Sequence, residues 1–313
     1  MKIAFVVDPL VTFKIYKDTT FVMMREAQAR GHEVYAIEQE ALYWQKNRVS
    51  AFASRIHLTG HSSVWFQAEA AQAHYLTDFD AVIMRKDPPF DMEYVYSTYL
   101  LEAAQAEGVK VFNRARGIRD HNEKLAIARY ASYIAPTLVT RRADLLRDFL
   151  AEHQDIILKP LDGMGGASVF RVRQDDPNVS VIIETLTQLG QRMIMAQRYL
   201  PDIAQGDKRI LLIAGKPVPY CLARIPQAGE TRGNLAAGGT GVARELTPRD
   251  LEIAHALGPK LYEQGLFLVG LDVIGSCLTE INVTSPTCFQ EISQQSHCDV
   301  AALFVDALEQ EMK

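Results

Sequence analysis

The sequence predicts an α/β and α+β protein in which a doubly wound parallel sheet comes first and a unit of mixed type follows. Apolar strand-like runs alternate with helical stretches up to about residue 122, and this β-α-β order is typical of parallel sheets. From about residue 123 several expected strands are instead joined by short turns, as in antiparallel pairs. A chain of 313 residues is also too long for one simple core, so we expect two or three compact units.

The N-terminal elements follow from short apolar runs bounded by turn residues. The run after Met1 ends at Asp8 and Pro9, so it predicts a buried strand rather than a signal peptide. Ligands bind at the carboxyl ends of parallel strands, which places Asp8 and the turn 85–87 at the edge of a candidate site. The expected elements are strand 2–7, helix 20–31, strand 33–37, a hairpin over 42–56, strand 81–85, helix 93–108 and strand 109–113.

The second half contains more strands and one clear helix start, where Thr247 can cap and Pro248 suits the first turn. The expected elements there are strands 155–158, 169–172 and 193–198, helix 178–189, paired strands 209–213 and 218–224, helix 247–265, strand 266–274, a following strand that contains 280–282, and helix 299–312.

Composition excludes several classes of protein. The net charge is −5, from 33 basic and 38 acidic residues that are well mixed, so no nucleic-acid surface is expected. We find no apolar run of roughly 18 residues, the length that a membrane span needs. The four cysteines form no C-x-x-C pair, which indicates reduced thiols and a cytoplasmic protein. The sequence also contains no dinucleotide fingerprint after the first strand and no P-loop.

The segment from Asp272 to Asn282 predicts a metal site. Glu280 and Asn282 lie two apart on one expected strand, so they share a face. A loop of odd length around Gly275 would place Asp272 opposite Glu280, and these oxygen ligands suit Mg²⁺, which usually accompanies nucleotide phosphates. Taken alone, the pattern favours an ordinary hairpin with polar residues toward solvent over a metal site.

Two further segments suit a nucleotide. Lys159 ends a strand just before Gly163, Gly165 and Gly166, where backbone N–H groups could approach anionic oxygens; a flexible turn explains the pattern as well. The strand 193–200 offers an apolar slot and backbone groups for a purine, although a buried strand is the simpler interpretation.

Two features could serve phosphoryl transfer. Arg209 and Arg224 lie on two expected neighbouring strands, and guanidinium groups suit phosphate oxygens, although exposed charges on a sheet would look the same. The stretch 226–241 is rich in glycine, lacks hydrophobic periodicity and has Arg232 as its one basic residue. It predicts either a mobile lid that excludes water or a disordered linker.

Five segments together resemble the bacterial glutathione synthetases of the ATP-grasp superfamily, and the resemblance runs almost end to end. They are residues 84–91 (MRKDPPFD), 157–166 (ILKPLDGMGG), 219–227 (PYCLARIPQ), 230–239 (ETRGNLAAGG) and 279–287 (TEINVTSPT).

The resemblance implies a pre-ATP-grasp domain over 1–122 and an ATP-grasp domain over 123–313, with two lobes that divide near 200–206. It also implies a homotetramer. It implies that the nucleotide is bound by Lys124, Lys159, Gly165 and Gly166 at its phosphates and by Gln197, Arg198, Tyr199 and Leu200 at adenine, with Asp207 in the nucleotide cleft. It implies metal binding by Asp272, Glu280 and Asn282, and contact with the transferred phosphoryl group by Arg209 and Arg224. The peptide would be bound or enclosed by Arg85, Arg232, Ser285, Pro286 and Thr287.

The expected activity is ATP-dependent ligation of γ-glutamylcysteine with glycine through an acyl phosphate, with Mg²⁺ or Mn²⁺ as cofactor. Such a reaction needs positioning and charge neutralisation rather than a protein nucleophile. The alternatives are an ATP-grasp ligase for another amino acid or dipeptide pair, and a non-catalytic ATP-binding regulatory protein. An intact lid argues against the second, because a protein that only binds ATP could dispense with it.

Overall fold

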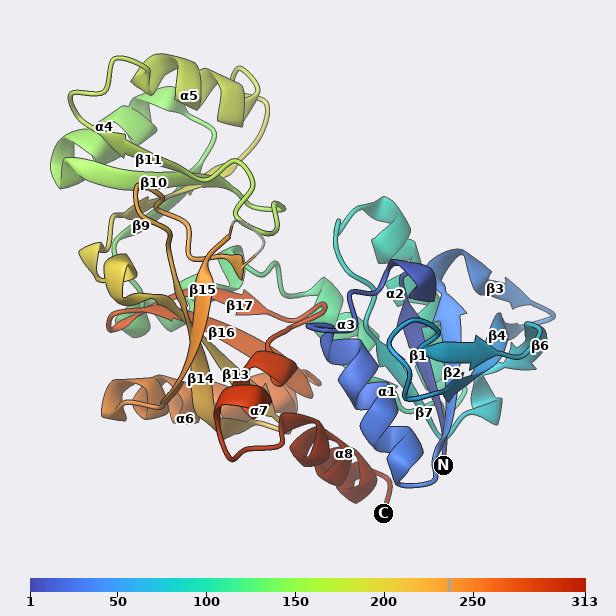
Figure 1. The fold of residues 1–313 in the computed structure, drawn as a ribbon. Helices are drawn as coiled ribbons and strands as arrows, with labels where there is room; N and C mark the ends of the chain where they lie inside the picture. Colours follow the sequence, from blue (N-terminus) through green and yellow to red (C-terminus); the bar gives the residue numbers. More distant parts are fainter. Residues whose placement is uncertain (236–237) are drawn as a thin grey trace.

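The computed structural model describes residues 1–235 and 238–313, so two residues of the predicted lid, Ala236 and Ala237, lie outside the described residues. Its strands form three sheets (Figure 1). The first sheet belongs to the N-terminal part of the chain, and the other two follow one another along the remainder. Within the described ranges, no helix is both long and apolar enough to cross a membrane.

The first sheet has the predicted parallel core and an antiparallel extension, of which the hairpin over 42–56 was predicted and the two short strands that follow it were not. Its path is β3-β4-β2-β1-β7-β8, in which β2, β1, β7 and β8 run parallel, while β5 and β6 pair with β4. The bounds of its elements are β1 Lys2–Val7, α1 Thr19–Ala29, β2 Glu33–Glu38, β3 Leu42–Gln45, β4 Arg48–Leu58, β5 Phe66–Ala68, β6 Gln72–Tyr75, β7 Ala81–Met84, α2 Met92–Ala106, β8 Val111–Phe112 and α3 Ala115–Arg119.

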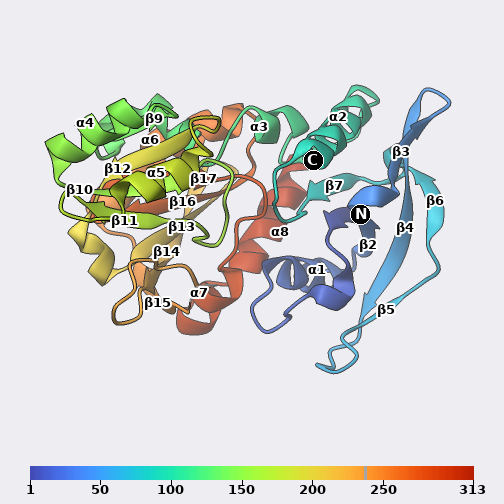
Figure 2. The same cartoon turned by 90° about the horizontal axis from the view of Figure 1, so that it is seen from above.

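The central strand β1 shows why this sheet is covered on both faces. Its side chains alternate between two cores, because successive residues of a strand point to opposite faces. Ile3 and Phe5 pack in the core that contains α1, whereas Ala4 and Val6 pack in the core that contains Tyr94 and other residues of α2. Figure 2 shows α1 and α2 on opposite sides of this sheet, as a doubly wound arrangement requires.

The C-terminal helix α8 (Val300–Glu311) returns to the N-terminal unit and packs beside α1 (Figure 1). Phe304 shares the core of Ile3 and Phe5. Arg30, at the end of α1, contacts Asp306 at 2.5 Å and Glu309 at 3.3 Å. The helix itself was predicted, but its packing against the first sheet could not be read from the sequence.

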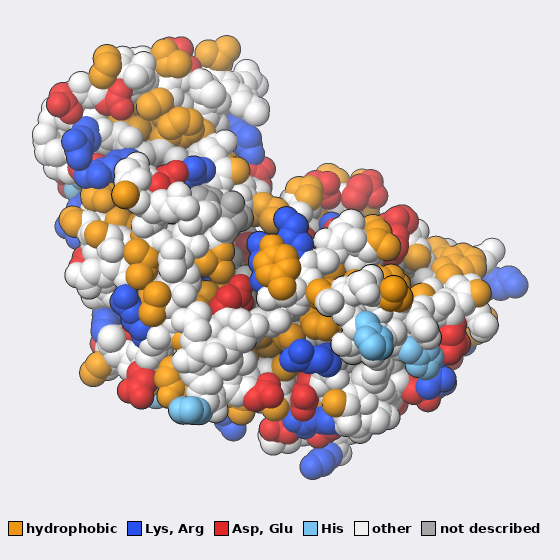
Figure 3. All heavy atoms as spheres, in the orientation of Figure 1, with side chains coloured by type: hydrophobic (Ala, Val, Ile, Leu, Met, Phe, Trp, Pro, Cys, Tyr) orange, Lys and Arg blue, Asp and Glu red, His pale blue; other side chains and the backbone are white. Residues whose placement is uncertain are grey.

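The other two sheets face each other across a cleft. The second has the order β11-β10-β12-β9 and the third β15-β14-β13-β16-β17, and all pairings within them are antiparallel. Figure 3 shows the small lobe of the second sheet projecting from the body, with the surface hollowed between that lobe and the N-terminal unit.

The bounds of the remaining elements are the 3₁₀ segment η4 Leu125–Tyr133, β9 Thr137–Thr140, α4 Ala143–His153, β10 Asp155–Pro160, β11 Phe170–Arg173, α5 Val179–Thr187, β12 Ile194–Arg198, the 3₁₀ segment η5 Pro201–Gln205, β13 Asp207–Ile213, β14 Lys216–Ile225, β15 Thr240–Glu245, α6 Pro248–Glu263, β16 Leu268–Ile274, β17 Cys277–Asn282 and α7 Phe289–Gln295. Thr247 caps α6 as predicted, and its side chain accepts a hydrogen bond from the Asp250 N–H. The end of the predicted lid is not a loop, because β15 begins at Thr240 and pairs with β14.

Candidate active site

A cavity of about 590 Å³ lies between the three parts of the chain, and residues from each of them line it. The predicted site residues that line it are Arg85, Lys124, Lys159, Gly165, Gly166, Gln197, Arg198, Tyr199, Leu200, Asp207, Arg209, Arg224, Arg232, Asp272, Glu280, Asn282, Ser285 and Thr287.

Pro286 is the exception among the predicted residues. It lies outside the cavity wall and borders a much smaller cavity with Ile83 and Phe112. Its carbonyl oxygen accepts a hydrogen bond of 3.0 Å from Arg85 Nη2. Pro286 thus lies behind the cavity wall, where it holds a residue that does face the cavity.

The β16–β17 hairpin brings Asp272 opposite Glu280, as predicted, but by a different route. The loop has two residues, Gly275 and Ser276, so the expectation of an odd-length loop is wrong. The register shifts instead between Asp272 and Val273, where Thr279 is the additional residue of β17. A bulge of this kind restores the pairing that a two-residue loop would otherwise displace by one position.

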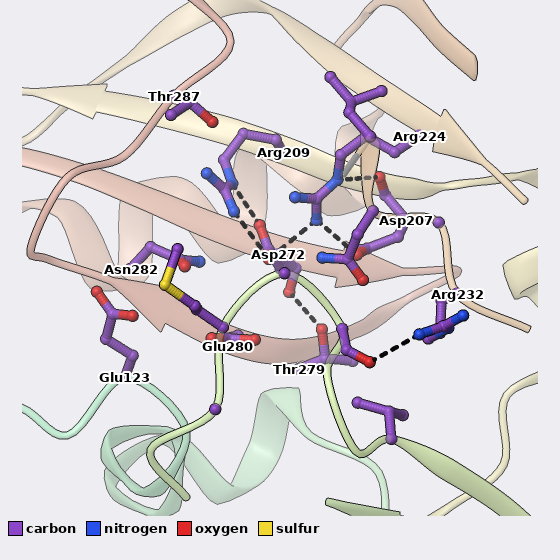
Figure 4. A pocket seen from close by; sticks show the side chains of 18 of the residues that line it. Glu123, Asp207, Arg209, Arg224, Arg232, Asp272, Thr279, Glu280, Asn282 and Thr287 are labelled. Atoms are coloured by element: carbon purple, nitrogen blue, oxygen red, sulfur yellow. Dashed lines mark hydrogen bonds and ion pairs between the residues drawn. The ribbon is translucent and has the colours of Figure 1, made fainter. Parts of the chain in front are cut away.

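Two arginines converge on Asp272 at the centre of the site (Figure 4). Arg209 Nε lies 2.5 Å from Asp272 Oδ1, and Arg224 Nη2 lies 2.9 Å from Asp272 Oδ2 and 2.5 Å from Asp207 Oδ2. Burial alone would raise the pKa of Asp272, but Arg209 and Arg224 outweigh it and hold this pKa well below its usual value. Burial raises the pKa of Asp207 to about 6, although Arg224 opposes the shift. The cluster thus presents guanidinium groups at a buried surface, where charges interact strongly.

The predicted metal ligands lie near each other, but they do not form a closed site. Among the described residues, no group of three or more His, Cys, Asp or Glu is arranged to hold a metal ion. Asn282 donates from Nδ2 to Gly270 O at 3.2 Å, which leaves its Oδ1 as the atom that could bind a metal. Burial and the nearby Glu280 carboxylate raise the pKa of Glu123. A cation beside Glu280 would relieve that repulsion, so the oxygen donors here fit Mg²⁺.

Two lysines link the metal region to the glycine-rich turn. Lys124 Nζ lies 3.3 Å from Glu280 Oε1 and also donates to Gly163 O. Lys159 Nζ donates to Thr279 O at 3.4 Å, and burial lowers its pKa. Both ammonium groups therefore lie between the turn and the third sheet, where two positive charges suit an anionic group.

The glycine-rich turn meets the predicted lid across the cavity. Gly166 has φ of +80°, and a β-carbon there would lie 2.7 Å from Asn234 Oδ1, closer than real contacts allow. Arg232 Nη1 donates to Gly166 O at 3.3 Å, and its Nη2 lies 2.6 Å from Glu230 Oε2. Glycine is thus needed at 166 both for the left-handed backbone and for the close approach of the stretch that contains Arg232.

The strand that was expected to contact a purine base already uses some of its backbone N–H groups in hydrogen bonds within the protein. Arg198 N donates to Pro136 O, and Tyr199 N donates to Asp155 O, both at 3.0 Å. Arg171 stacks on the Tyr199 ring at 3.6 Å from the ring centroid. The backbone N–H groups of Arg198 and Tyr199 are therefore already used, and the expected contacts with a base are left to Leu200 and to backbone carbonyl groups of 197–200.

Glu123 is a cavity residue that the sequence did not single out. Its Oε1 accepts hydrogen bonds from Val283 N at 2.8 Å, from Thr284 N at 3.0 Å and from Thr284 Oγ1 at 2.8 Å. It thus fixes the chain that leaves β17 just beyond Asn282. No local pattern marks Glu123, because its partners are 160 and 161 residues away in the sequence.

The arrangement of an N-terminal unit followed by two lobes around a charged cleft defines an ATP-grasp ligase fold. The D-cycloserine synthetase DcsG has the same fold, with a TM-score of 0.69, 16% identity and coverage of 99% of this chain and 100% of that chain. The ATP-grasp ligase PsnB, solved with its minimal precursor, Mg and ADP, matches with a TM-score of 0.63, 18% identity and coverage of 99% and 98%.

Sequence comparison gives the family within that fold. Residues 1–119 match the N-terminal domain of prokaryotic glutathione synthetase, and residues 123–297 match its ATP-grasp domain. The glutathione synthetase of Ralstonia nicotianae is 60% identical over 99% of this chain and 95% of its own length. That of Nitrosomonas europaea is 59% identical over 99% and 98%. The chain belongs to the prokaryotic glutathione synthetase family.

Proposed function

We propose that the protein joins γ-L-glutamyl-L-cysteine to glycine and converts ATP to ADP and phosphate. The observation that carries this proposal is the match of both family domains along the chain, together with relatives named glutathione synthetase that are close to 60% identical. The guanidinium groups of Arg209 and Arg224 at the cavity wall support the proposal, since phosphoryl transfer requires positive charge beside the transferred group.

The reaction has two steps. An oxygen of the cysteinyl carboxylate attacks the γ-phosphorus of ATP, the bond to the β,γ-bridging oxygen breaks, and ADP leaves. The glycine nitrogen then attacks the acyl carbon, and inorganic phosphate departs with its electron pair as the peptide bond forms. Each step needs the reactants held in line within a site that excludes water, so most of the rate enhancement comes from binding and orientation.

We assign the roles within that scheme as follows. Arg209 and Arg224 contact the transferred phosphoryl group, while Lys124 and Lys159 bind the ATP phosphates. Asp272, Glu280 and Asn282 would hold Mg²⁺, or Mn²⁺ in its place, and such an ion supplies neutralisation of phosphate charge when it is bound. Residues 197–200 contact adenine, with Asp207 in the nucleotide cleft, and Gly165 and Gly166 contact the phosphates. Arg85, Ser285 and Thr287 contact the peptide, and Arg232 encloses the intermediate.

Three further properties belong to the same proposal. We divide the chain into a pre-ATP-grasp domain over 1–122 and an ATP-grasp domain over 123–313, whose two lobes divide near 200–206. The assembly is a homotetramer, as the family resemblance implies. The enzyme works in the cytoplasm, which agrees with four free cysteines among the described residues.

The test is a paired assay of phosphate release and peptide product. ATP and Mg²⁺ are supplied with γ-glutamylcysteine and glycine, and in parallel with D-alanine pairs and other acid and amine pairs. We expect glutathione and phosphate in a ratio of one, and little turnover with the other pairs. Turnover confined to another pair would identify a different ligase, and ATP binding without turnover of any pair would favour the regulatory alternative.

A further inference from the structure

The turn 10–18, between β1 and α1, brings charged side chains to the cavity wall. Lys14 and Lys17 line the cavity, whereas Phe13 does not. Two apolar side chains of the turn, Val11 and Tyr16, are 82% and 70% exposed, so they do little to hold it. The contacts that fix the turn therefore decide where its charged groups lie.

The second half of this turn is held by α7. The buried side chain of Gln290 donates from Nε2 to Ile15 O at 2.8 Å and to Asp18 O at 2.7 Å. Both acceptors lie after residue 14, so these bonds fix the end of the turn that leads into α1. They do not hold its first half, which contains Phe13.

The first half of the turn packs on a tryptophan from the antiparallel extension of the first sheet. The rings of Phe13 and Trp65 are stacked, with centroids 5.7 Å apart and 15° between their planes. Phe21, in α1, meets the ring of Trp65 edge-on with centroids 5.3 Å apart. Aromatic pairs in these geometries attract each other beyond the area that they bury. Trp65 does not line the cavity, so any effect that it has on the site passes through Phe13.

The loop that carries Trp65 is itself tied to α1. Gln28 Oε1 accepts from Leu58 N at 2.7 Å, and Gln28 Nε2 donates to Leu58 O at 3.0 Å. The amide of Gln28 thus takes the place of a neighbouring strand at the end of β4. Thr59 N donates to Trp65 O at 3.1 Å, and the ring of Phe66 lies 4.5 Å from that of Trp65. Trp65 is therefore a fixed support for the turn.

We infer that Trp65 is a positioning residue for the ligation, which holds Phe13 and thereby fixes the first half of the turn 10–18 against the cavity. This inference rests on the proposed function. The turn belongs to the N-terminal unit, as does Arg85, which is assigned to the peptide, whereas ATP is assigned to the cleft between the other two sheets. Loss of the Trp65 ring therefore weakens the use of the peptide and leaves the use of ATP unchanged.

The test measures kcat and KM for each substrate in full-length variants, with ATP, Mg²⁺, γ-glutamylcysteine and glycine. Trp65→Ala should raise the KM for γ-glutamylcysteine by about three- to tenfold, the range expected for the loss of one aromatic pair. The KM for ATP and the kcat at saturating peptide should stay within about 1.5-fold of wild type. Trp65→Phe keeps an aromatic ring against Phe13 and should restore most of the wild-type KM.

A double-mutant cycle tests whether Trp65 acts through Phe13. Phe13→Ala should raise the KM for γ-glutamylcysteine about as much as Trp65→Ala, and the double variant should raise it no further, because both changes remove the same contact. Trp44→Ala is the matched control, since Trp44 is the other tryptophan of the chain and is 56% exposed on β3 of the same extension. It should leave every kinetic constant unchanged. Thermal melting of each variant separates a loss of fold from a displaced turn.

Three results would overturn the positioning role. One is an unchanged KM for γ-glutamylcysteine in Trp65→Ala. Another is a pair of effects from Phe13→Ala and Trp65→Ala that add in the double variant. The third is a Trp65→Ala variant in which kcat and both KM values worsen together with the melting temperature, since Trp65 would then only stabilise the fold. A wild-type protein that makes no product from γ-glutamylcysteine would instead overturn the proposed function, so the two failures are distinguishable.

Discussion

Asp272 and Glu280 are paired across one hairpin, and replacing each with its amide should give different effects on stability but the same effect on turnover. Asp272 contacts Arg209 and Arg224, and its side chain is 5% exposed. Asp272→Asn removes the charge that both arginines share, and breaking a buried ion pair in this way costs about 3–5 kcal/mol. We therefore expect a clearly lower melting temperature for Asp272→Asn.

Glu280→Gln should cost much less stability. The Glu280 side chain is 21% exposed and has one ion pair, at 3.3 Å from Lys124 Nζ, which also donates to Gly163 O. The loss of that charged hydrogen bond is worth about 1–2 kcal/mol, and solvent at the partly open site reduces it further. The fold should survive with a small shift in melting temperature.

Turnover should fall by about two orders of magnitude or more in both variants, because each removes a negative charge where the metal and the phosphates are expected. Melting and ATP turnover should be measured on the same samples, with turnover measured well below both melting temperatures. Full activity in Glu280→Gln would refute the metal assignment and leave Glu280 as a structural residue of the hairpin. Wild-type melting of Asp272→Asn would refute the stabilising role of the arginine contacts.

Three other substitutions test the lid, the glycine turn and a buried ion pair. Arg232→Ala removes the contact with Gly166 O, so phosphate release should exceed glutathione formation; a ratio that stays at one would favour a linker over a lid. Gly166→Ala forces a β-carbon against Asn234 Oδ1 and should weaken ATP binding in calorimetry, whereas unchanged affinity would show that the two loops separate freely. Asp250→Asn leaves Lys208 without its buried partner and should cost about 3 kcal/mol by chemical denaturation, with turnover at low temperature retained.

Controls for these variants come from comparable positions away from the cavity. Asp144→Asn removes an exposed pair with Arg142 and should leave the melting temperature unchanged. If it destabilised the protein as much as Asp250→Asn, burial would not explain the larger effect. Arg244→Ala, on β15 beyond the predicted lid, should keep the ratio of phosphate to glutathione at one.

Local sequence patterns gave most of the strands and helices. The runs that became β1, β2, β7 and β16 were predicted from apolar residues between turn signals, and α6 was predicted from its Thr247 cap and proline. The strands β5, β6 and β9 and the helix α4 were missed. The three strands are short or polar, and neighbouring strands stabilise them rather than their own periodicity, whereas α4 has Leu146 and Leu150 at helical spacing and was predictable from its sequence.

The residue types of the site were also predictable, since carboxylates, arginines and lysines beside glycines indicate phosphate chemistry. The positions of these residues relative to one another could not be predicted in the same way. Asp272 faces Glu280 because of a bulge at Thr279 rather than an odd loop, and the pattern D-x₇-E-x-N does not distinguish the two. Nor does any local pattern show that the Pro286 carbonyl accepts a hydrogen bond from Arg85, a residue 201 positions earlier.

The sequence by itself determined the family, the order of the elements and the chemical groups available for catalysis. These follow from local composition and from motifs of ten residues or fewer. Only the tertiary structure decided which groups meet. Glu123 and Glu291 enter the cavity through contacts with distant segments, and α8 completes the core of a sheet formed at the other end of the chain. Such pairings depend on the packing of whole elements, because hydrogen bonds and burial act between neighbours in space whatever their separation in sequence.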